Sequence, residues 1–347
     1  MGDKQHRSIY DIDYDELASI VATWGEAKYR AGQIWQGLYG NLWGESDQFS
    51  ILPTPLRKKL AEEFRFTQLV PVRTLTSSDG ETVKTLFRLS DQRTIEAVLM
   101  RYNKRRTLCI STQSGCAMGC VFCATGQMGF QRNLSSGEIV EQVIYYARIL
   151  TAQGEKISNV VIMGMGEPFH NYGQTMQAID RLSHPEGLKL GARRFTISTV
   201  GLIPAIRRFA AERRQVNLAV SLHASDDELR SSLLPINKKY PIGELIQACR
   251  EYVQQTRRRI TFEWALIRDI NDSIEQARQL AETLQGLLCH VNVIPLNPTR
   301  VYEGQATTRQ RALAFKAELE KHGIPCSIRL RRGIDIQAGC GQLATDT

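Results

Sequence analysis

The sequence has no long apolar run. No stretch of about 18 consecutive apolar residues occurs in the 347-residue chain, which argues against a membrane-spanning helix. The first residues, 1–7, contain no apolar signal segment, and no internal repeat or low-complexity segment is present. With 42% hydrophobic and 23% charged residues, the chain has the composition of an ordinary globular protein. We therefore expect a cytoplasmic protein with no membrane partner.

The eight cysteines also lack the spacing of a zinc site. A structural zinc ion prefers two pairs of ligands, and no second Cys/His pair accompanies the closely spaced cysteines here. Cysteines in a chain without a secretion signal are more often metal-binding or catalytic than disulfide-bonded. Three of them, Cys116, Cys120 and Cys123, follow the spacing C-x3-C-x2-C with no fourth cysteine nearby.

This three-cysteine run predicts an iron–sulfur cluster. Clusters are held by cysteine thiolates, and a [4Fe–4S] cube has four irons to ligate. Three thiolates leave one iron free to chelate a small molecule. The run, with the aromatic Phe122 before the last cysteine, resembles the signature of the radical S-adenosylmethionine (radical SAM) enzymes.

The pattern of apolar residues predicts an α/β fold with added parts. Residues 10–66 have helical periodicity, and residues 83–89 and 94–100 alternate as paired strands. Strands are then expected near 107–112, 159–163, 194–199, 216–222, 259–266, 291–295 and 325–330. Helices are expected near 136–152, 172–183, 202–213, 241–255, 273–286 and 306–322. About six strand–helix units fall short of a complete eight-fold barrel, so we predict a partial (β/α)6 radical SAM barrel. A doubly wound open sheet is the alternative.

Six further runs narrow the resemblance to one branch of these enzymes. They are residues 107–113, 164–168, 198–201, 221–224, 295–298 and 339–343. Together they resemble the RlmN/Cfr family of RNA adenosine methyltransferases, over roughly residues 15 to 344, and the RlmN branch more closely. Two departures are mild: Arg331-Arg332-Gly333-Ile334-Asp335 replaces a more acidic stretch, and the segment 300–306 is short.

The resemblance implies a division of the chain and a set of partners. It implies a helical N-terminal RNA-binding accessory domain (1–68), a strand-rich connector (69–101), a radical SAM core (102–333) and a C-terminal tail (334–347). The formal net charge of +8 and the pI of about 9.1 permit RNA as a partner. The implied RNA substrates are 23S rRNA and tRNA, the implied electron donor is a flavodoxin, and the protein is expected to be a monomer.

The resemblance also assigns cofactors. Cys116, Cys120 and Cys123 would hold one [4Fe–4S] cluster per subunit, and two molecules of SAM would be used per turnover. Residues implied to bind SAM are Gly166, Glu167, Ser198, Ser221, Leu222, His223 and Asn297. Several of these lie at the carboxyl ends of predicted strands, where sites of such folds gather. Taken singly, the polar residues also suit helix caps, and His223 suits a structural histidine.

Three residues receive catalytic roles by the same resemblance. Cys340 would accept a methyl group, Glu96 would act as the general base, and Cys109 would close a transient disulfide with Cys340. Carbon 2 of adenine is electron-poor and does not attack a sulfonium methyl as an amine would, so a radical route is needed. Taken alone, Cys109 suits a packed strand thiol and Glu96 a solvated strand carboxylate.

Competing functions remain at this point. One is methylation of carbon 8 of adenosine, as in the Cfr branch, which is linked to antibiotic resistance. Another is a cluster-carrying RNA-binding protein without turnover, which would have no use for Glu96 or Cys340. A third is a radical SAM enzyme that acts on a small molecule or peptide. We predict methylation of carbon 2, in the peptidyl-transferase centre of 23S rRNA and in tRNA at the adenosine 3′ of the anticodon.

Overall fold

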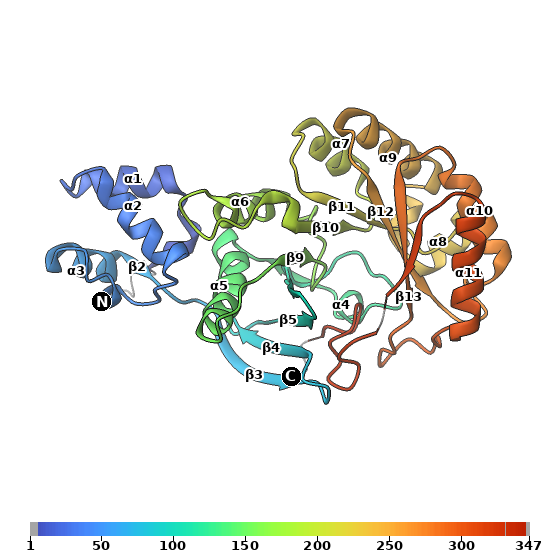
Figure 1. The fold of residues 1–347 in the computed structure, drawn as a ribbon, viewed down its shortest axis with the longest axis horizontal. Helices are drawn as coiled ribbons and strands as arrows, with labels where there is room; N and C mark the ends of the chain where they lie inside the picture. The colour runs from blue at the N-terminus through green and yellow to red at the C-terminus, as the bar shows by residue number, and fades with distance from the viewer. Residues whose placement is uncertain (1–5, 330, 345–347) are drawn as a thin grey trace.

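A ten-stranded mixed sheet organises the molecule (Figure 1). The computed structural model describes residues 6–329 and 331–344. Residue 330, the last of the expected strand 325–330, and residues 345–347 of the expected tail lie outside that range. Seven of the strands run parallel in chain order: β6 (Arg105–Cys109), β9 (Asn159–Ile162), β10 (Phe195–Thr199), β11 (Asn217–Ser221), β12 (Ile260–Leu266), β13 (Cys289–Pro295) and β14 (Cys326–Ile328).

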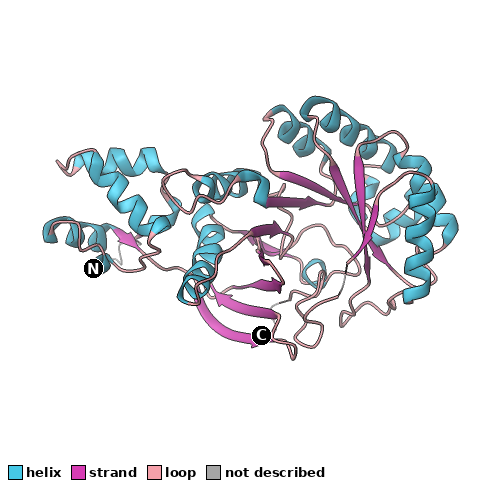
Figure 2. Cartoon of the chain, in the orientation of Figure 1, coloured by secondary structure: helices cyan, strands magenta, loops and turns pink. Residues whose placement is uncertain are grey.

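Helices follow these strands and lie along the outside of the curved sheet (Figures 1 and 2). They are α5 (Ser136–Ala152), α6 (Tyr172–Ser183), α7 (Ile203–Ala211), α9 (Ile242–Thr256), α10 (Ile274–Leu284) and α11 (Arg309–Lys321). The strand order never reverses, whereas a doubly wound sheet reverses at its switch point. The predicted partial (β/α)6 barrel is therefore confirmed. None of the described helices is long and apolar enough to cross a membrane.

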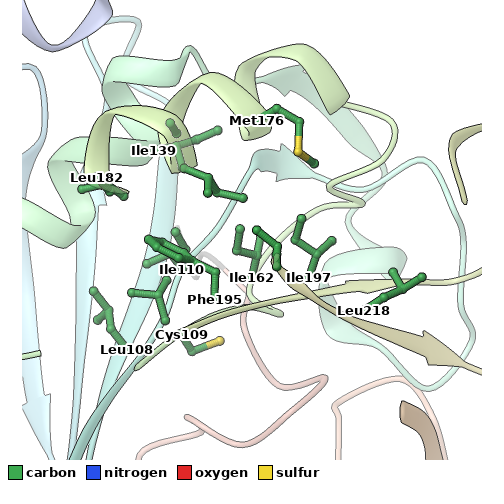
Figure 3. Packing of buried hydrophobic residues seen from close by; sticks show 14 of the residues in the cluster. Leu108, Cys109, Ile110, Ile139, Ile162, Met176, Leu182, Phe195, Ile197 and Leu218 are labelled. Carbon is green, nitrogen blue, oxygen red and sulfur yellow. The ribbon is translucent and has the colours of Figure 1, made fainter. Parts of the chain in front are cut away.

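Side chains along the barrel strands alternate between the hydrophobic core under the helices and the interior of the barrel. Leu108, Ile110, Ile162 and Phe195 point to the helices, where they pack with side chains such as Ile139 of α5 (Figure 3). Successive side chains of a strand point to opposite faces. The residues between them therefore face the interior of the barrel.

Three antiparallel strands extend the barrel sheet beyond β6. They are β3 (Val70–Thr76), β4 (Thr82–Arg88) and β5 (Thr94–Tyr102), and β5 pairs with β6. Register pairs Leu86 with Glu96, Lys84 with Val98, and Val98 with Cys109. Lys84, Glu96 and Cys109 therefore share one face of the sheet. The C-terminal segment covers this face, because Lys84 Nζ donates to the carbonyl of Gln337 (3.2 Å).

Short helices precede the sheet, as the helical periodicity of residues 10–66 predicts. They are α1 (Tyr14–Thr23), α2 (Tyr29–Trp35) and α3 (Thr54–Glu63). Although the helical periodicity is continuous in the sequence, α2 begins at Tyr29 and continues as a π-helical segment, Gln36–Gly40. Gly37 lies in that segment against Phe49, and a Cβ there would come within 2.3 Å of the ring. A tertiary contact thus sets the local geometry, which local periodicity does not reveal.

Polar contacts hold this helical part against α5. The Asp11 carboxylate accepts from the Gly137 N–H (2.6 Å) at the first turn of α5. The Arg148 guanidinium of α5 donates to the carbonyls of Leu42 (2.8 Å) and Trp43 (3.1 Å). Both ends of α5 are therefore fixed to the segments that flank the N-terminal helices.

Candidate active site

A small hairpin carries the three-cysteine loop. Strands β7 (Gln113–Gly115) and β8 (Phe130–Asn133) are antiparallel and close the base of the loop. The Cys116 N–H donates to the Gly129 carbonyl (2.9 Å), and the Cys123 N–H donates to the Cys120 carbonyl (3.1 Å). The sequence did not predict this hairpin, whose strands are only three and four residues long. It fixes both ends of the segment that bears the thiols.

The three thiols lie in a dry environment. Cys116 and Cys120 are buried, and burial raises the pKa of Cys116 to about 12 and that of Cys120 well above its ordinary value. Burial likewise raises the pKa of Cys123. Thiols in such a place are neutral unless positive charge is bound, and a metal centre supplies that charge.

The geometry of these thiols suits a cluster better than a single ion. Among the residues that the structure describes, no three His, Cys, Asp or Glu side chains converge closely enough to hold one metal ion. A tetrahedral zinc ion needs such convergence. In a [4Fe–4S] cluster each thiolate binds a different iron, so the sulfurs need not meet at one point. The three thiols would thus hold a cluster, which would supply one-electron chemistry beside the adjoining cleft that Cys120 and Cys123 line.

The C-terminal tail lies directly against the cysteine loop. The Ala124 N–H donates to the Gly341 carbonyl (2.7 Å), and the Thr125 hydroxyl donates to the Leu343 carbonyl (2.6 Å). Asn297, at the end of the barrel, donates through Nδ2 to the carbonyl of Cys340 (3.0 Å). These contacts bring Cys340, which is exposed, beside residues far away in the sequence.

A cleft of about 890 Å³, part of it open to solvent, opens beside the loop at the carboxyl ends of the strands. The residues predicted to bind SAM that line it are Gly166, Glu167, Ser198, Ser221, His223 and Asn297. Leu222 is the exception, because it is fully buried in the hydrophobic core and does not line the cleft. Cys120, Cys123 and Cys340 line the same cleft, so the cluster loop, the tail and the strand ends meet there.

Gly166 and Glu167 form a tight turn at the floor of the cleft. Gly166 has φ 101°, and a Cβ there would lie 2.6 Å from the Cβ of Gln113, so no larger residue fits. The Glu167 carboxylate accepts from the Phe169 N–H and the Val200 N–H, both at 2.9 Å. Burial raises its pKa to about 7. A bound ammonium would favour its charged form.

His223 is held as a neutral ring. Its Nδ1 accepts from the Ala265 N–H (2.8 Å), and burial lowers its pKa to about 3. The neutral tautomer that accepts at Nδ1 carries its proton on Nε2, which is then a donor in a ring that lines the cleft. The buried Arg230 fixes the neighbouring strand ends by donating to the carbonyls of Val200 (2.7 Å) and Leu222 (3.1 Å).

Two buried acceptors in the cleft have no hydrogen-bond partner among the described residues. They are Asn297 Oδ1 and Glu263 Oε2. Buried polar atoms are normally satisfied, so this pair indicates a ligand with hydrogen-bond donors. The ammonium, ribose hydroxyls and adenine amine of SAM are such donors. Glu263 was not predicted, although a single charged residue in the otherwise uncharged strand Ile260–Leu266 was a signal for it.

A second cavity adjoins the first and contains both remaining thiols of interest. Cys109 and Cys340 both line it, with Arg329 in the wall that it shares with the cleft. Burial raises the pKa of Cys109 to about 12, and the positive charge of Arg329 opposes that rise. Cys109 thus packs in the hydrophobic core and also lines a cavity that Cys340 lines.

Glu96 is buried, which corrects the reading of a solvated carboxylate. Its side chain is 5% exposed, and its Oε1 lies 2.8 Å from Lys84 Nζ. Its Oε2 accepts from the Ala344 N–H (3.1 Å) of the tail. Removing one partner of a buried ion pair costs about 3–5 kcal/mol of folding free energy, because the other charge is left buried without a partner. Lys84 therefore stabilises the buried Glu96 carboxylate. Glu96 thus lies on the same sheet face as Cys109, under the tail that carries Cys340.

These features define the class of the protein. A model of the radical SAM superfamily matches residues 110–281, which span the cysteine loop and much of the barrel. The solved structure of a radical SAM methyltransferase from Sphaerobacter thermophilus superposes with a TM-score of 0.95 at 51% identity, covering 97% of this chain and 99% of that one. The protein is a radical SAM enzyme, a class that implies a [4Fe–4S] cluster and SAM as cofactors.

Curated relatives identify the family within this class. The dual-specificity RNA methyltransferase RlmN 1 of Myxococcus xanthus is 49% identical over 336 residues, which cover 97% of this chain and 94% of the relative. A probable dual-specificity RNA methyltransferase RlmN of Chloroflexus aurantiacus is 48% identical, covering 98% of this chain and 93% of the relative. The chain belongs to the RlmN family, and it is a SAM-dependent RNA methyltransferase.

Loss of one cluster cysteine should empty the loop of iron. Anaerobically reconstituted protein is expected to bind one [4Fe–4S] cluster, and Cys116→Ala should lose its absorbance, at roughly 400 nm for thiolate-bound iron. Cys249→Ala, which removes a buried thiol of α9, is the matched control and should keep it. Full iron retention when all three loop cysteines are alanine would refute the ligand assignment.

Proposed function

We propose that the protein methylates carbon 2 of adenosine in two RNAs. These are 23S rRNA, at the peptidyl-transferase centre, and tRNA, at the adenosine 3′ of the anticodon. One observation supports the proposal above the others: Cys109 and Cys340 line a single cavity that adjoins the cleft beside the cluster loop. A protein that only bound RNA would have no use for two thiols placed this way.

In the proposed reaction the side chains of the cleft hold SAM. Glu167 accepts from its ammonium group, and Asn297 Oδ1 and Glu263 Oε2, which have no partner among the described residues, accept from further donors of SAM. Ser198 and Ser221 supply hydroxyl groups to the same cleft. Cys116, Cys120 and Cys123 hold the cluster, which, when bound, supplies the electron for reductive cleavage of SAM.

The thiols and the carboxylate then act in sequence. Cys340 takes a methyl group from one SAM by displacement, forming a sulfur–carbon bond as the sulfonium–methyl bond breaks. The Cys340 S-methyl group loses a hydrogen atom, which ends in the 5′-deoxyadenosine that forms, with methionine, from a second SAM. The Cys340 methylene radical then adds to carbon 2, and the unpaired electron of this adduct passes to the one-electron carrier. Glu96 takes the proton from carbon 2. Cys109 attacks the Cys340 sulfur and closes a disulfide, and the carbon that leaves this sulfur takes a proton from solvent, which completes the methyl group of the released RNA.

The proposed partners follow from the chemistry. A one-electron donor of the flavodoxin type reduces the cluster, and a thiol reductant reopens the disulfide after each turnover. The N-terminal helices, fixed to α5, serve as an accessory RNA-binding part of a monomer that works in the cytoplasm, where its RNA substrates are found. Because RNA bases are modified when unstacked, a loop of the RNA presents the target.

Mass spectrometry of nucleosides separates this proposal from its nearest competitor. Unmodified 23S rRNA and tRNA transcripts are treated with reconstituted enzyme, SAM and reductant, then digested. We expect 2-methyladenosine in both RNAs, and none with Cys340→Ala. Formation of 8-methyladenosine would overturn the assignment of carbon 2, and methylation of only one RNA would overturn the dual specificity.

A further inference from the structure

The cavity that holds the two thiols opens into a hollow rich in arginine. This hollow is lined by Arg101, Tyr102, Asn103, Arg106, Arg331 and Arg332, with the carboxylates Asp79 and Glu81. Tyr102, Arg331 and Arg332 line both this hollow and the cavity that contains Cys109 and Cys340, called the thiol cavity below. The hollow is therefore the outer mouth of the thiol cavity. None of these residues has a role in the cofactor site.

A tyrosine ring organises the cations of this mouth. The guanidinium carbon of Arg332 lies 4.5 Å from the centroid of the Tyr102 ring, and that of Arg105 lies 5.3 Å from it. Both distances fall within cation–π range. Arg105 stands at the start of β6, directly opposite Tyr102 at the end of β5. The ring thus holds guanidinium groups from two distant parts of the chain at the cavity rim.

Some of these cations are neutralised and others are not. Glu155 pairs with Arg106 and lies 3.8 Å from Arg101, while Glu81 lies 3.8 Å from Arg332. Arg105 and Arg331 are exposed, and no described carboxylate lies within 4.0 Å of either. Two guanidiniums without a carboxylate partner among the described residues therefore lie at the entrance, since Arg331 lines both spaces and Arg105 contacts the Tyr102 ring.

We propose that this mouth binds the phosphodiester backbone of the single-stranded RNA on either side of the target nucleotide. The inference rests on the proposed role of the two thiols, since a base that reaches them leaves its own phosphates at the rim. Guanidinium groups suit phosphate because they can donate two parallel hydrogen bonds. Tyr102 adds a ring on which a neighbouring base can stack, which single-stranded recognition commonly uses.

The mouth also gives a role to the basic run Arg331-Arg332. Its guanidinium groups line both the hollow and the cavity that holds the two thiols, so they stand where the substrate backbone must pass. The charge excess is thus placed at the entrance to the thiol cavity, where it can steer an RNA loop toward the site.

RNA binding without SAM tests the proposal. Arg105→Gln/Arg331→Gln is compared with Arg257→Gln/Arg259→Gln, an equal loss of charge at the start of β12, away from the strand ends that line the site. Fluorescence anisotropy with a labelled anticodon stem-loop RNA gives the affinity at several salt concentrations. Two lost phosphate contacts should reduce the slope of log affinity against log salt by about 1.4 and weaken binding roughly tenfold or more at about 0.1 M salt.

The outcomes are decisive and separate from those of the proposed function. If Arg105→Gln/Arg331→Gln loses more RNA affinity and more salt dependence than Arg257→Gln/Arg259→Gln, the result supports RNA binding by the mouth. Equal losses in the two variants would overturn the proposal. Tyr102→Phe should bind as the parent does, whereas Tyr102→Leu should bind more weakly. Methylation of Cys340 needs SAM but no RNA, so it should be unchanged in Arg105→Gln/Arg331→Gln. Its absence from the parent protein would instead count against the proposed function.

Discussion

Replacing Cys109 with alanine should trap the enzyme on its RNA. In Cys109→Ala the methyl transfer to Cys340 and the joining of its methylene to carbon 2 can still take place. The missing step is the attack that frees the Cys340 sulfur, so a covalent protein–RNA adduct should accumulate and multiple turnover should cease. Cys340→Ala should form no adduct. The adduct is a slowly migrating band on a denaturing gel that both nuclease and protease remove.

The surroundings of Cys109 make this a clean test. The side chain lies at the edge of the packed cluster in Figure 3, and the residue as a whole is 8% exposed, so alanine removes one sulfur atom from a cavity wall. Cys326→Ala, which changes a buried thiol of β14 outside both cavities, should turn over normally. Normal turnover of Cys109→Ala without a band would show that another group resolves the intermediate.

The sequence predicted the parts of the site that depend on spacing. Cys116, Cys120 and Cys123 lie within one short loop, so their spacing alone indicated the cluster site. The alternation of strands and helices predicted the barrel because each strand and each helix has its own local pattern of apolar residues. The carboxyl ends of parallel strands meet at one edge, which is why Ser198 and Ser221 were expected together and do line one cleft. Local pattern and parallel topology were enough for these inferences.

Other features depend on contacts between distant segments. Glu96 is buried because Lys84 of the neighbouring strand β4 pairs with it and because Ala344 of the tail covers it. Glutamate side chains are usually exposed, and for this reason the alternative of a solvated strand carboxylate was wrong. Glu263 and the arginines at the cavity mouth were missed for a related reason. Their roles appear only when the fold brings them beside a cavity.

Replacing Cys340 should abolish methylation altogether. Cys340→Ala removes the proposed methyl acceptor, so no RNA product, no adduct and no methylated protein should form. The backbone contacts of the tail do not need the sulfur, since Asn297 donates to the Cys340 carbonyl and Ala124 to the Gly341 carbonyl. The variant should therefore fold and retain its cluster absorbance, which separates loss of the acceptor from loss of structure. Residual methylation of RNA by this variant would refute the role of Cys340.

The measurement that tests the central claim most directly is the location of the methyl group before RNA is added. Reconstituted protein is incubated with SAM that carries a trideuterated methyl, then digested and analysed by peptide mass spectrometry. We predict a labelled methyl on Cys340 and on no other cysteine, and the label should pass to carbon 2 of adenosine when RNA and reductant follow. A label on Cys326, or fully active enzyme with no labelled cysteine, would contradict the proposed reaction.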